Sequence, residues 1–291
     1  MPSASLSLAG SGWATLRRRS PLALRHLGLV LAIAWLVLLA VMALAPSWVA
    51  TRDPNASDFM AMLAPPSPEH FFGTDALGRD LFSRIVYGAR YSISIGLGAM
   101  GVALLLALPL GIAGGVGNTL VDGFVMRLTD ILGAFPEMLL AILVIALIGP
   151  GTSNLIVALG IAATPKLMRV IRAQTRTVML SGYVEYGTLL GQARHKTILR
   201  HVLPNAIGTL PVLVTISLGF AVISTASLSF LGLGPQAPTP EWGLMLSESL
   251  STLRVAWWAG VFPGVMITSL VIALTLLANA LQASYEKRRP A

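Results

Sequence analysis

The sequence contains no cysteine and few charged residues. Because none of its 291 residues is cysteine, disulfide bonds, thiolate metal sites and cysteine nucleophiles are excluded. Asp, Glu, Lys and Arg make up 11% of the chain, whereas about a quarter of a soluble domain is usually charged. Hydrophobic residues make up 55%. This composition predicts a protein that lies in a membrane.

A phosphate-binding loop is also absent, because no stretch reads G-x-x-x-x-G-K-[ST]. If the protein is driven by ATP, we expect ATP and Mg²⁺ to be bound by partner subunits. The four histidines (His26, His70, His195 and His201) are scattered and lack the spacing of metal ligands. We therefore expect no catalytic residue, no bound cofactor and no metal site, and we expect the chain not to be an enzyme.

One pattern typical of dinucleotide sites occurs, at Gly96, Gly98 and Gly101. Such a site needs a preceding strand and a helix N-terminus that presents amides to the pyrophosphate. These glycines lie inside a continuous apolar stretch, where small residues allow helices to approach closely. We interpret them, and the pair Gly111 and Gly115, as helix-packing positions.

Six apolar stretches approach or exceed the roughly 20 residues that a membrane-spanning helix needs. They are residues 27–45, 91–115, 121–148, 154–169, 206–231 and 255–281. The alternative for the first stretch is a cleaved signal peptide, since residues 43–45 resemble a cleavage site. Its apolar run is longer than that of a typical signal peptide and Pro46 follows directly, which favours a retained helix. The sequence therefore predicts an all-α membrane protein with six transmembrane helices.

Two polar segments are predicted on the outer side of the membrane. In residues 46–72 the prolines favour an extended loop, and residues 232–254 form a second loop. Residues 73–90 carry alternating charges among apolar residues at helical spacing. This pattern predicts a helix that lies along the membrane interface, with its charges facing solvent or headgroups.

The positive charges predict the orientation of the chain. With both termini inside the cell, the inner segments contain 15 of the 20 Lys and Arg residues. Because inner loops of membrane proteins are enriched in these residues, both termini and the loop 183–205 are expected to face the cytoplasm. The net charge of +8 is thus explained by topology, and we expect no nucleic-acid partner.

The most informative segment is the polar loop 183–205, which lies between two apolar stretches. Residues 183–190 suit a short helix that Gly191 would end, and Pro204 suits the start of the next long helix. A short helix held between two spans could transmit movement from another subunit. This stretch resembles the cytoplasmic "EAA" loop of permease subunits of bacterial ABC importers, with Glu185, Gly191 and Leu203-Pro204 in matching places.

Four further stretches are similar to the C-type permeases of the peptide and nickel importers within that family. They are FGTDALGRDLFSRIVYGAR (72–90), DILGAFPEMLLA (130–141), ASLSFLGLG (226–234) and TPEWGLML (239–246). Together with the loop they cover about residues 70–280 in the family's order. The resemblance implies a type I permease fold with a cytoplasmic coupling helix.

The resemblance also implies partners: a homologous second permease, two ATP-binding subunits, an extracytoplasmic substrate-binding protein and the bilayer of the bacterial inner membrane. The loop would couple transport to ATP hydrolysis through Tyr183, Val184, Glu185, Tyr186, Gly187, Leu190, Gly191 and Arg194. Tyr186 and Gly187 depart from the family's usual pair of alanines, and residues 278–280 read Ala-Asn-Ala where Gly-Asp-Gly is common. The expected divisions are a tail (1–26), an anchor helix (27–45), an external segment (46–87), a permease domain (88–282) and a tail (283–291).

Three residues of the third apolar stretch are candidates for the pathway or its hinge: Asp130, Pro136 and Glu137. Pro136 should kink the helix and free backbone carbonyls. An ionisable residue within a span is a functional candidate because charge is costly in lipid. For Asp130 we favour the simpler interpretation of a pair with Arg127, three residues earlier.

Other functions remain as alternatives. A secondary transporter should show inverted repeats and charged midplane residues, but Glu137 is the only deeply placed carboxylate. An intramembrane enzyme would need paired catalytic groups at membrane depth. For an importer, the preferred cargo is a peptide, with glutathione, nickel or metal-chelator complexes as alternatives.

Overall fold

The structure, a computed structural model, describes residues 22–288. The basic residues expected in the two tails, Arg17, Arg18, Arg19 and Arg289, lie outside the described residues. Between residues 22 and 288 the regular elements are helices, as predicted. Five of them are long and apolar enough to cross a membrane: α1 (Leu22–Leu44), α2 (Leu81–Val116), α5 (Thr152–Met179), α9 (Leu210–Phe230) and α11 (Trp258–Arg288).

A sixth candidate span is broken. α3 (Thr119–Gly133) and α4 (Glu137–Ile148) pass the same test of length and composition only together, and they are bent by 86° at the short break between them. Pro136 is the residue before α4, so the kink predicted there is a complete interruption of the helix. If the bent pair is one span, the described chain has the six predicted spans.

Short helices connect the spans. Between α5 and α9 the chain forms α6 (Gly182–Leu189), α7 (Arg194–Thr197), a π-helical turn η3 (Ile198–Val202), α8 (Leu203–Ala206) and a 3-10 turn η4 (Ile207–Thr209). The prediction that a long helix begins at Pro204 is wrong, because α8 has only four residues and α9 begins at Leu210. The segment between α9 and α11 contains α10 (Trp242–Ser249), and the segment between α1 and α2 contains the 3-10 turns η1 (Pro46–Trp48) and η2 (Phe59–Ala61).

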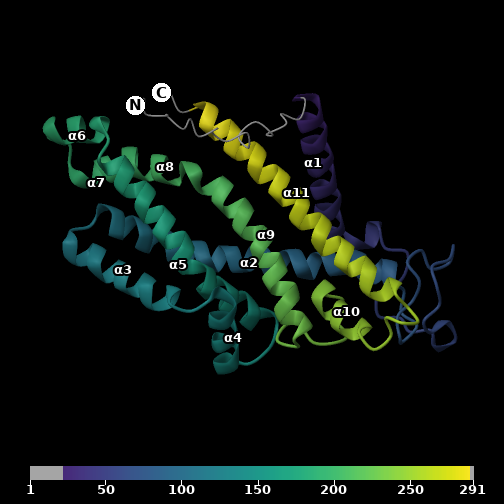
Figure 1. The fold of residues 1–291 in the computed structure, drawn as a ribbon. Coiled ribbons are helices and arrows are strands. Elements are labelled where there is room, and N and C mark those ends of the chain that lie inside the picture. The colour runs from purple at the N-terminus through teal and green to yellow at the C-terminus, as the bar shows by residue number, and fades with distance from the viewer. Residues whose placement is uncertain (1–21, 289–291) are drawn as a thin grey trace, which may run out of the picture.

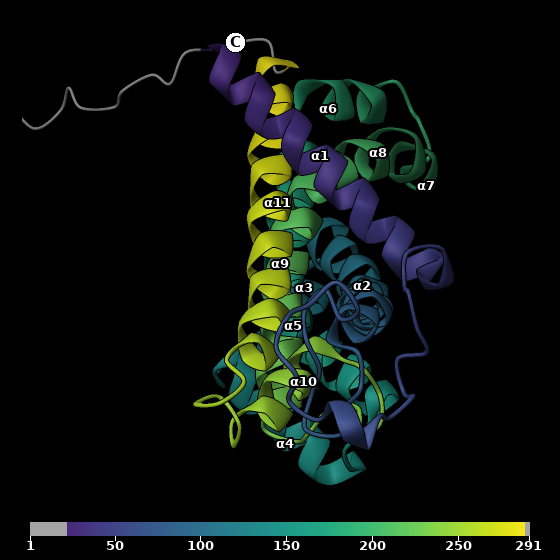
Figure 2. The same ribbon diagram turned by 90° about the vertical axis from the view of Figure 1, so that its right-hand side faces the viewer.

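The elements gather at two ends of the molecule. The start of α1, the end of α11 and the short helices α6 and α8 lie at one end, and α4 and α10 lie at the other (Figures 1 and 2). α2 and α5 form the most extensive helix pair, and α9 packs between α2 and α11. The ends that the positive-inside rule placed on one side of the membrane therefore lie together.

Glycines allow the close contact between α2 and α5. A Cβ atom at Gly111 would lie 2.9 Å from Ile171 Cβ, and one at Gly115 would lie 2.5 Å from Thr175 Cβ. Gly98 similarly faces Ile156. The helix-packing prediction is thus confirmed for these glycines, whereas nothing lies within 4 Å of a Cβ at Gly101.

At the start of α2 the structure differs from the prediction of a separate interfacial helix. α2 begins at Leu81, where Asp80 caps it by accepting a hydrogen bond from the amide of Ser83 at 2.9 Å. It then continues without interruption to Val116. Gly73 and Gly78, with φ of +75° and +72°, keep the preceding residues out of a helix.

Four charged side chains of this segment, Asp75, Arg79, Asp80 and Arg84, are buried rather than solvated, whereas Arg90 is exposed. Arg79 Nε lies 2.6 Å from Asp75 Oδ2, and both Arg79 and Arg84 contact Glu248 Oε2, at 3.2 and 3.3 Å. Arg84 has no exposed surface. The predicted solvent-facing edge is therefore wrong for these four residues. Asp75, Arg79 and Arg84 can be buried because each has an opposite charge beside it, which offsets the cost of desolvation.

Candidate functional site

The predicted coupling helix is present. α6 spans Gly182–Leu189, one residue earlier than expected, and Gly191 has φ +77° in the left-handed region. The amide of Gln192 donates a hydrogen bond to the carbonyl of Gly187 at 3.1 Å, the pattern of a Schellman C-cap. The prediction that Gly191 ends this helix is confirmed, and α7 begins three residues later, at Arg194.

α6 has one face against the protein and one face outward. Val184 is 3% exposed and Gly187 is buried, whereas Tyr186 is 70% and Leu189 75% exposed. Glu185 is exposed as well. The outward face therefore combines one carboxylate with large apolar side chains, a composition suited to contact with another protein.

Neighbouring residues hold α6 in place. The amide of Val184 donates a hydrogen bond to the carbonyl of Ser181 at 3.0 Å. Only two residues separate the end of α5 from the start of α6. The ring of Tyr183 lies edge-on to that of His201, with centroids 6.3 Å apart. At Gly187 a Cβ atom would lie 3.2 Å from Gln192 Oε1, so the usual alanine would crowd that side chain.

The second group of candidates lies at the break between α3 and α4. Asp130 Oδ1 accepts a hydrogen bond from Arg169 Nη2 at 2.9 Å, and both side chains are largely exposed. The predicted pair of Asp130 with Arg127 is therefore wrong, because the partner comes from α5. Glu137, in the first turn of α4, faces a different part of α5.

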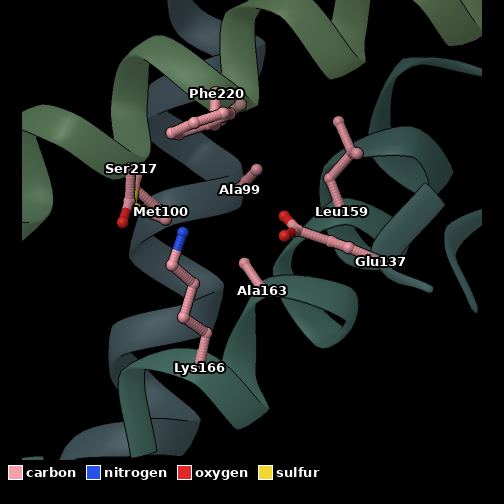
Figure 3. Close-up of a pocket in the computed structure, with 9 residues that line it drawn as sticks. Ala99, Met100, Glu137, Leu159, Ala163, Lys166, Ser217 and Phe220 are labelled. Atoms are coloured by element: carbon pink, nitrogen blue, oxygen red, sulfur yellow. The ribbon is translucent and has the colours of Figure 1, made fainter. Parts of the chain in front are cut away.

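Glu137 lines a narrow cavity together with Lys166, one of the 15 positive residues that were expected in the inner segments. The two side chains extend into the same space from α4 and α5, with Phe220 of α9 on one side (Figure 3). The ammonium of Lys166 lies 4.8 Å from the centroid of the Phe220 ring. The sequence signal that could have identified Lys166 is its position within an apolar span, directly after Pro165.

A second ionic contact joins the spans near α6. Asp122 in the first turn of α3 accepts hydrogen bonds from Arg172, at 2.6 Å from Nη2, and from Arg176 Nη1 at 3.1 Å. Both arginines are on α5, within the last turns before α6. Asp122 therefore links α3 to the end of α5 that leads into α6.

The family is established by comparison with known proteins. A family model described as "Binding-protein-dependent transport system inner membrane component" matches residues 107–289, more than half of the chain. The chain belongs to this family. It is a permease subunit of an ABC importer, an inner membrane component rather than an enzyme, and the motif resemblance is confirmed. Membership also sets aside the secondary-transporter and intramembrane-enzyme alternatives.

Curated relatives of the permease match it over most of its length. It is 36% identical to the glutathione transport system permease protein GsiD of Escherichia coli O6:K15:H31 (strain 536 / UPEC) over 277 residues, 95% of this chain and 89% of the relative. It is also 36% identical to the di/tripeptide transport system permease protein DppC of Pseudomonas aeruginosa (strain UCBPP-PA14), over 87% of this chain and 86% of the relative.

Solved structures show the same fold. A chain of the inward-facing MetNI methionine ABC transporter matches with a TM-score of 0.54 and 18% identity, over 68% of the permease and 96% of that chain. A chain of an amino acid ABC transporter crystallised with histidines matches with a TM-score of 0.55 and 15% identity, over 71% and 94%. The predicted all-α ABC importer permease fold is thereby confirmed.

Proposed function

We propose that the permease forms half of a translocation pathway for short peptides, including the tripeptide glutathione. Its partners are a homologous second permease, two ATP-binding subunits that hold ATP and Mg²⁺, and an extracytoplasmic binding protein. Both termini and α6 face the cytoplasm, so α10 faces outward. The names of the two curated relatives, a glutathione and a di/tripeptide permease, support this choice of cargo.

The observation that carries the coupling role is the outward face of α6. Its exposed apolar side chains would be unfavourable in water, and contact with an ATP-binding subunit would cover them. The contact residues are the exposed members of the predicted loop, Tyr183, Glu185, Tyr186 and Leu190, while Val184, Gly187 and Gly191 fix the shape of α6.

Movement of α6 then reaches the pathway through the spans. α5 precedes α6 directly, and α5 contacts α3 through Asp122 and Asp130. The break at Pro136 lets α3 and α4 move separately, which gives the pathway a hinge. Alternating access would result when ATP binding on the partner subunits draws the two permeases together.

The test is substrate-stimulated ATPase activity of the complete reconstituted complex. We expect Glu185→Ala and Gly191→Asp to assemble normally but to show stimulation weaker by about tenfold, the effect of losing about 1.4 kcal/mol of coupling. Aspartate at Gly191 would also strain a left-handed residue by roughly 1–2 kcal/mol.

Gly232→Asp is the matched control, because Gly232 has φ +79°, no atom within 4 Å of an added Cβ, and lies at the opposite end of α9. It should keep normal stimulation. If both loop variants stimulate ATP hydrolysis as the unaltered protein does, α6 is not the coupling element.

A further inference from the structure

Two opposite charges face the same cavity between candidate membrane spans. The cavity that Glu137 and Lys166 share is also lined by Ala99 of α2 and Phe220 of α9 (Figure 3). Ala99, Lys166 and Phe220 each lie close to the midpoint of their helix, and all three helices are candidate spans. The cavity therefore lies among the candidate membrane-spanning helices.

Neither charge has a hydrogen-bonded partner among the described residues. Between residues 22 and 288 neither the ammonium of Lys166 nor the carboxylate of Glu137 makes a hydrogen bond or a salt bridge, and the ammonium lies over the face of Phe220. Lys166 is exposed and Glu137 is half-buried. An exposed lysine at this depth cannot face lipid without a large cost, so this face borders a pathway or another subunit.

We propose that Lys166 and Glu137 are a binding site for the charged ends of the cargo, with Lys166 taking a carboxylate and Glu137 an ammonium. The inference rests on the proposed function, since a peptide carries both groups. A charge-assisted hydrogen bond to each end would replace the water that the cargo loses on entering the membrane. Both residues thus act as specificity-determining groups.

The present conformation is closed to such a cargo. The cavity has a volume of about 10 Å³, which is no more than one water molecule needs. Binding therefore requires α4, α5 and α9 to separate around the two charges. The break before α4 provides the freedom for this movement, because α4 is not continuous with α3.

The experiment measures uptake by the complete transporter in proteoliposomes. The probes are trialanine and glutathione, each compared with its C-terminally amidated and its N-acetylated form. The variants are Lys166→Gln, Lys166→Arg and Glu137→Gln. Because the binding protein is the same in all preparations, its own selectivity cancels in each ratio of variant to unaltered protein.

We expect Lys166→Gln to lower uptake of the free-carboxylate probe about tenfold more than uptake of its amide, the ratio that one charge-assisted hydrogen bond supplies. Glu137→Gln should show the same ratio for the free amine over its acetylated form. Lys166→Arg keeps the charge and should restore the preference. Arg127→Gln removes an exposed cation of α3 outside the cavity and should leave both ratios unchanged.

Equal loss of uptake for free and blocked probes would mean that the pair has a structural role only, and it would overturn this inference while leaving the proposed function intact. Unchanged uptake by both variants would overturn it as well. If the unaltered transporter takes up neither trialanine nor glutathione, the proposed function itself fails, and the binding site with it.

Discussion

Glu241 is a buried carboxylate that joins α10 to α2 at the end of the permease that carries α4 and α10. It has no exposed surface, and its oxygens accept hydrogen bonds from the amides of Gly243 and Leu244 at 3.0 and 2.9 Å, which caps α10. The hydroxyl of Ser92 on α2 donates to it at 2.9 Å. Burial raises the pKa of Glu241 above its ordinary value of 4.5, and the hydrogen bonds that the carboxylate accepts only partly oppose this.

A pH dependence follows from this shift. Because the folded protein holds the Glu241 proton more tightly than the unfolded chain does, the free energy of unfolding should fall as pH rises above about 4.5 through the raised pKa. We expect Glu241→Gln to flatten this fall, measured as the thermal midpoint of the detergent-solubilised protein from about pH 4 to about pH 8.

Glu69→Gln, at an exposed carboxylate on the same side, is the control and should keep the original slope. An unchanged slope in Glu241→Gln would show that another group is responsible. The variant also loses one acceptor for the α10 amides, so its stability at low pH should lie below that of the unaltered protein by about 1 kcal/mol.

For single residues, the sequence identified candidates better than it identified the partners that surround them. Glu137 was identified from its place after Pro136, but Lys166 opposite it was not. Asp75, Arg79 and Arg84 were assigned to solvent because their spacing matched an amphipathic helix. Their burial depends on Glu248, more than 160 residues away, and a contact of that range cannot be recognised from the spacing of neighbouring residues.

α2 and α5 form the most extensive contact between two helices of the bundle. At Gly160 of α5 an added Cβ would lie 2.5 Å from Val102 Cβ and 3.0 Å from the carbonyl oxygen of Ala99. Neither the backbone atom nor the β-branched valine can move without shifting α2. The two helices are therefore held at a separation that only glycine permits at this position.

We expect Gly160→Ala to destabilise the permease by about 1–3 kcal/mol, the usual cost of overpacking a tight core. The thermal midpoint in detergent, with the monodisperse fraction on size exclusion, measures this effect. Gly101→Ala is the matched control on α2, since nothing lies within 4 Å of its Cβ, and it should be neutral or stabilising. Equal midpoints for the two variants would contradict the packing argument.

Helix boundaries divide into those that the sequence encodes locally and those that it does not. Gly191 ends α6 where predicted, because the left-handed backbone conformation after a helix favours glycine. Pro136 was predicted to kink a helix, but the angle of 86° depends on how α3 and α4 pack against α5. The sequence did not predict that α2 continues without a break from Leu81. Its first turns contain charged residues, and Arg84 there pairs with Glu248, which is far away in the sequence.

At the scale of the whole molecule, the distribution of positive charge and the fold agree. The start of α1, the end of α11 and the loop that carries α6 lie at one end, as the positive-inside rule required of segments on one side (Figure 2). Spans and sidedness are predictable because they depend on composition summed over many residues. Which side faces the cytoplasm remains a prediction.

The absence of cysteine makes that prediction directly testable. Gln192→Cys places a thiol in the exposed turn after α6, and Arg254→Cys places one in the exposed segment between α10 and α11. In intact spheroplasts a membrane-impermeant maleimide should label Arg254→Cys and spare Gln192→Cys, and it should label both after detergent opens the membrane. The unaltered chain has no thiol, so it reports the background in each condition. Labelling of Gln192→Cys in intact spheroplasts would invert the orientation, and α6 could not then contact a cytoplasmic ATP-binding subunit.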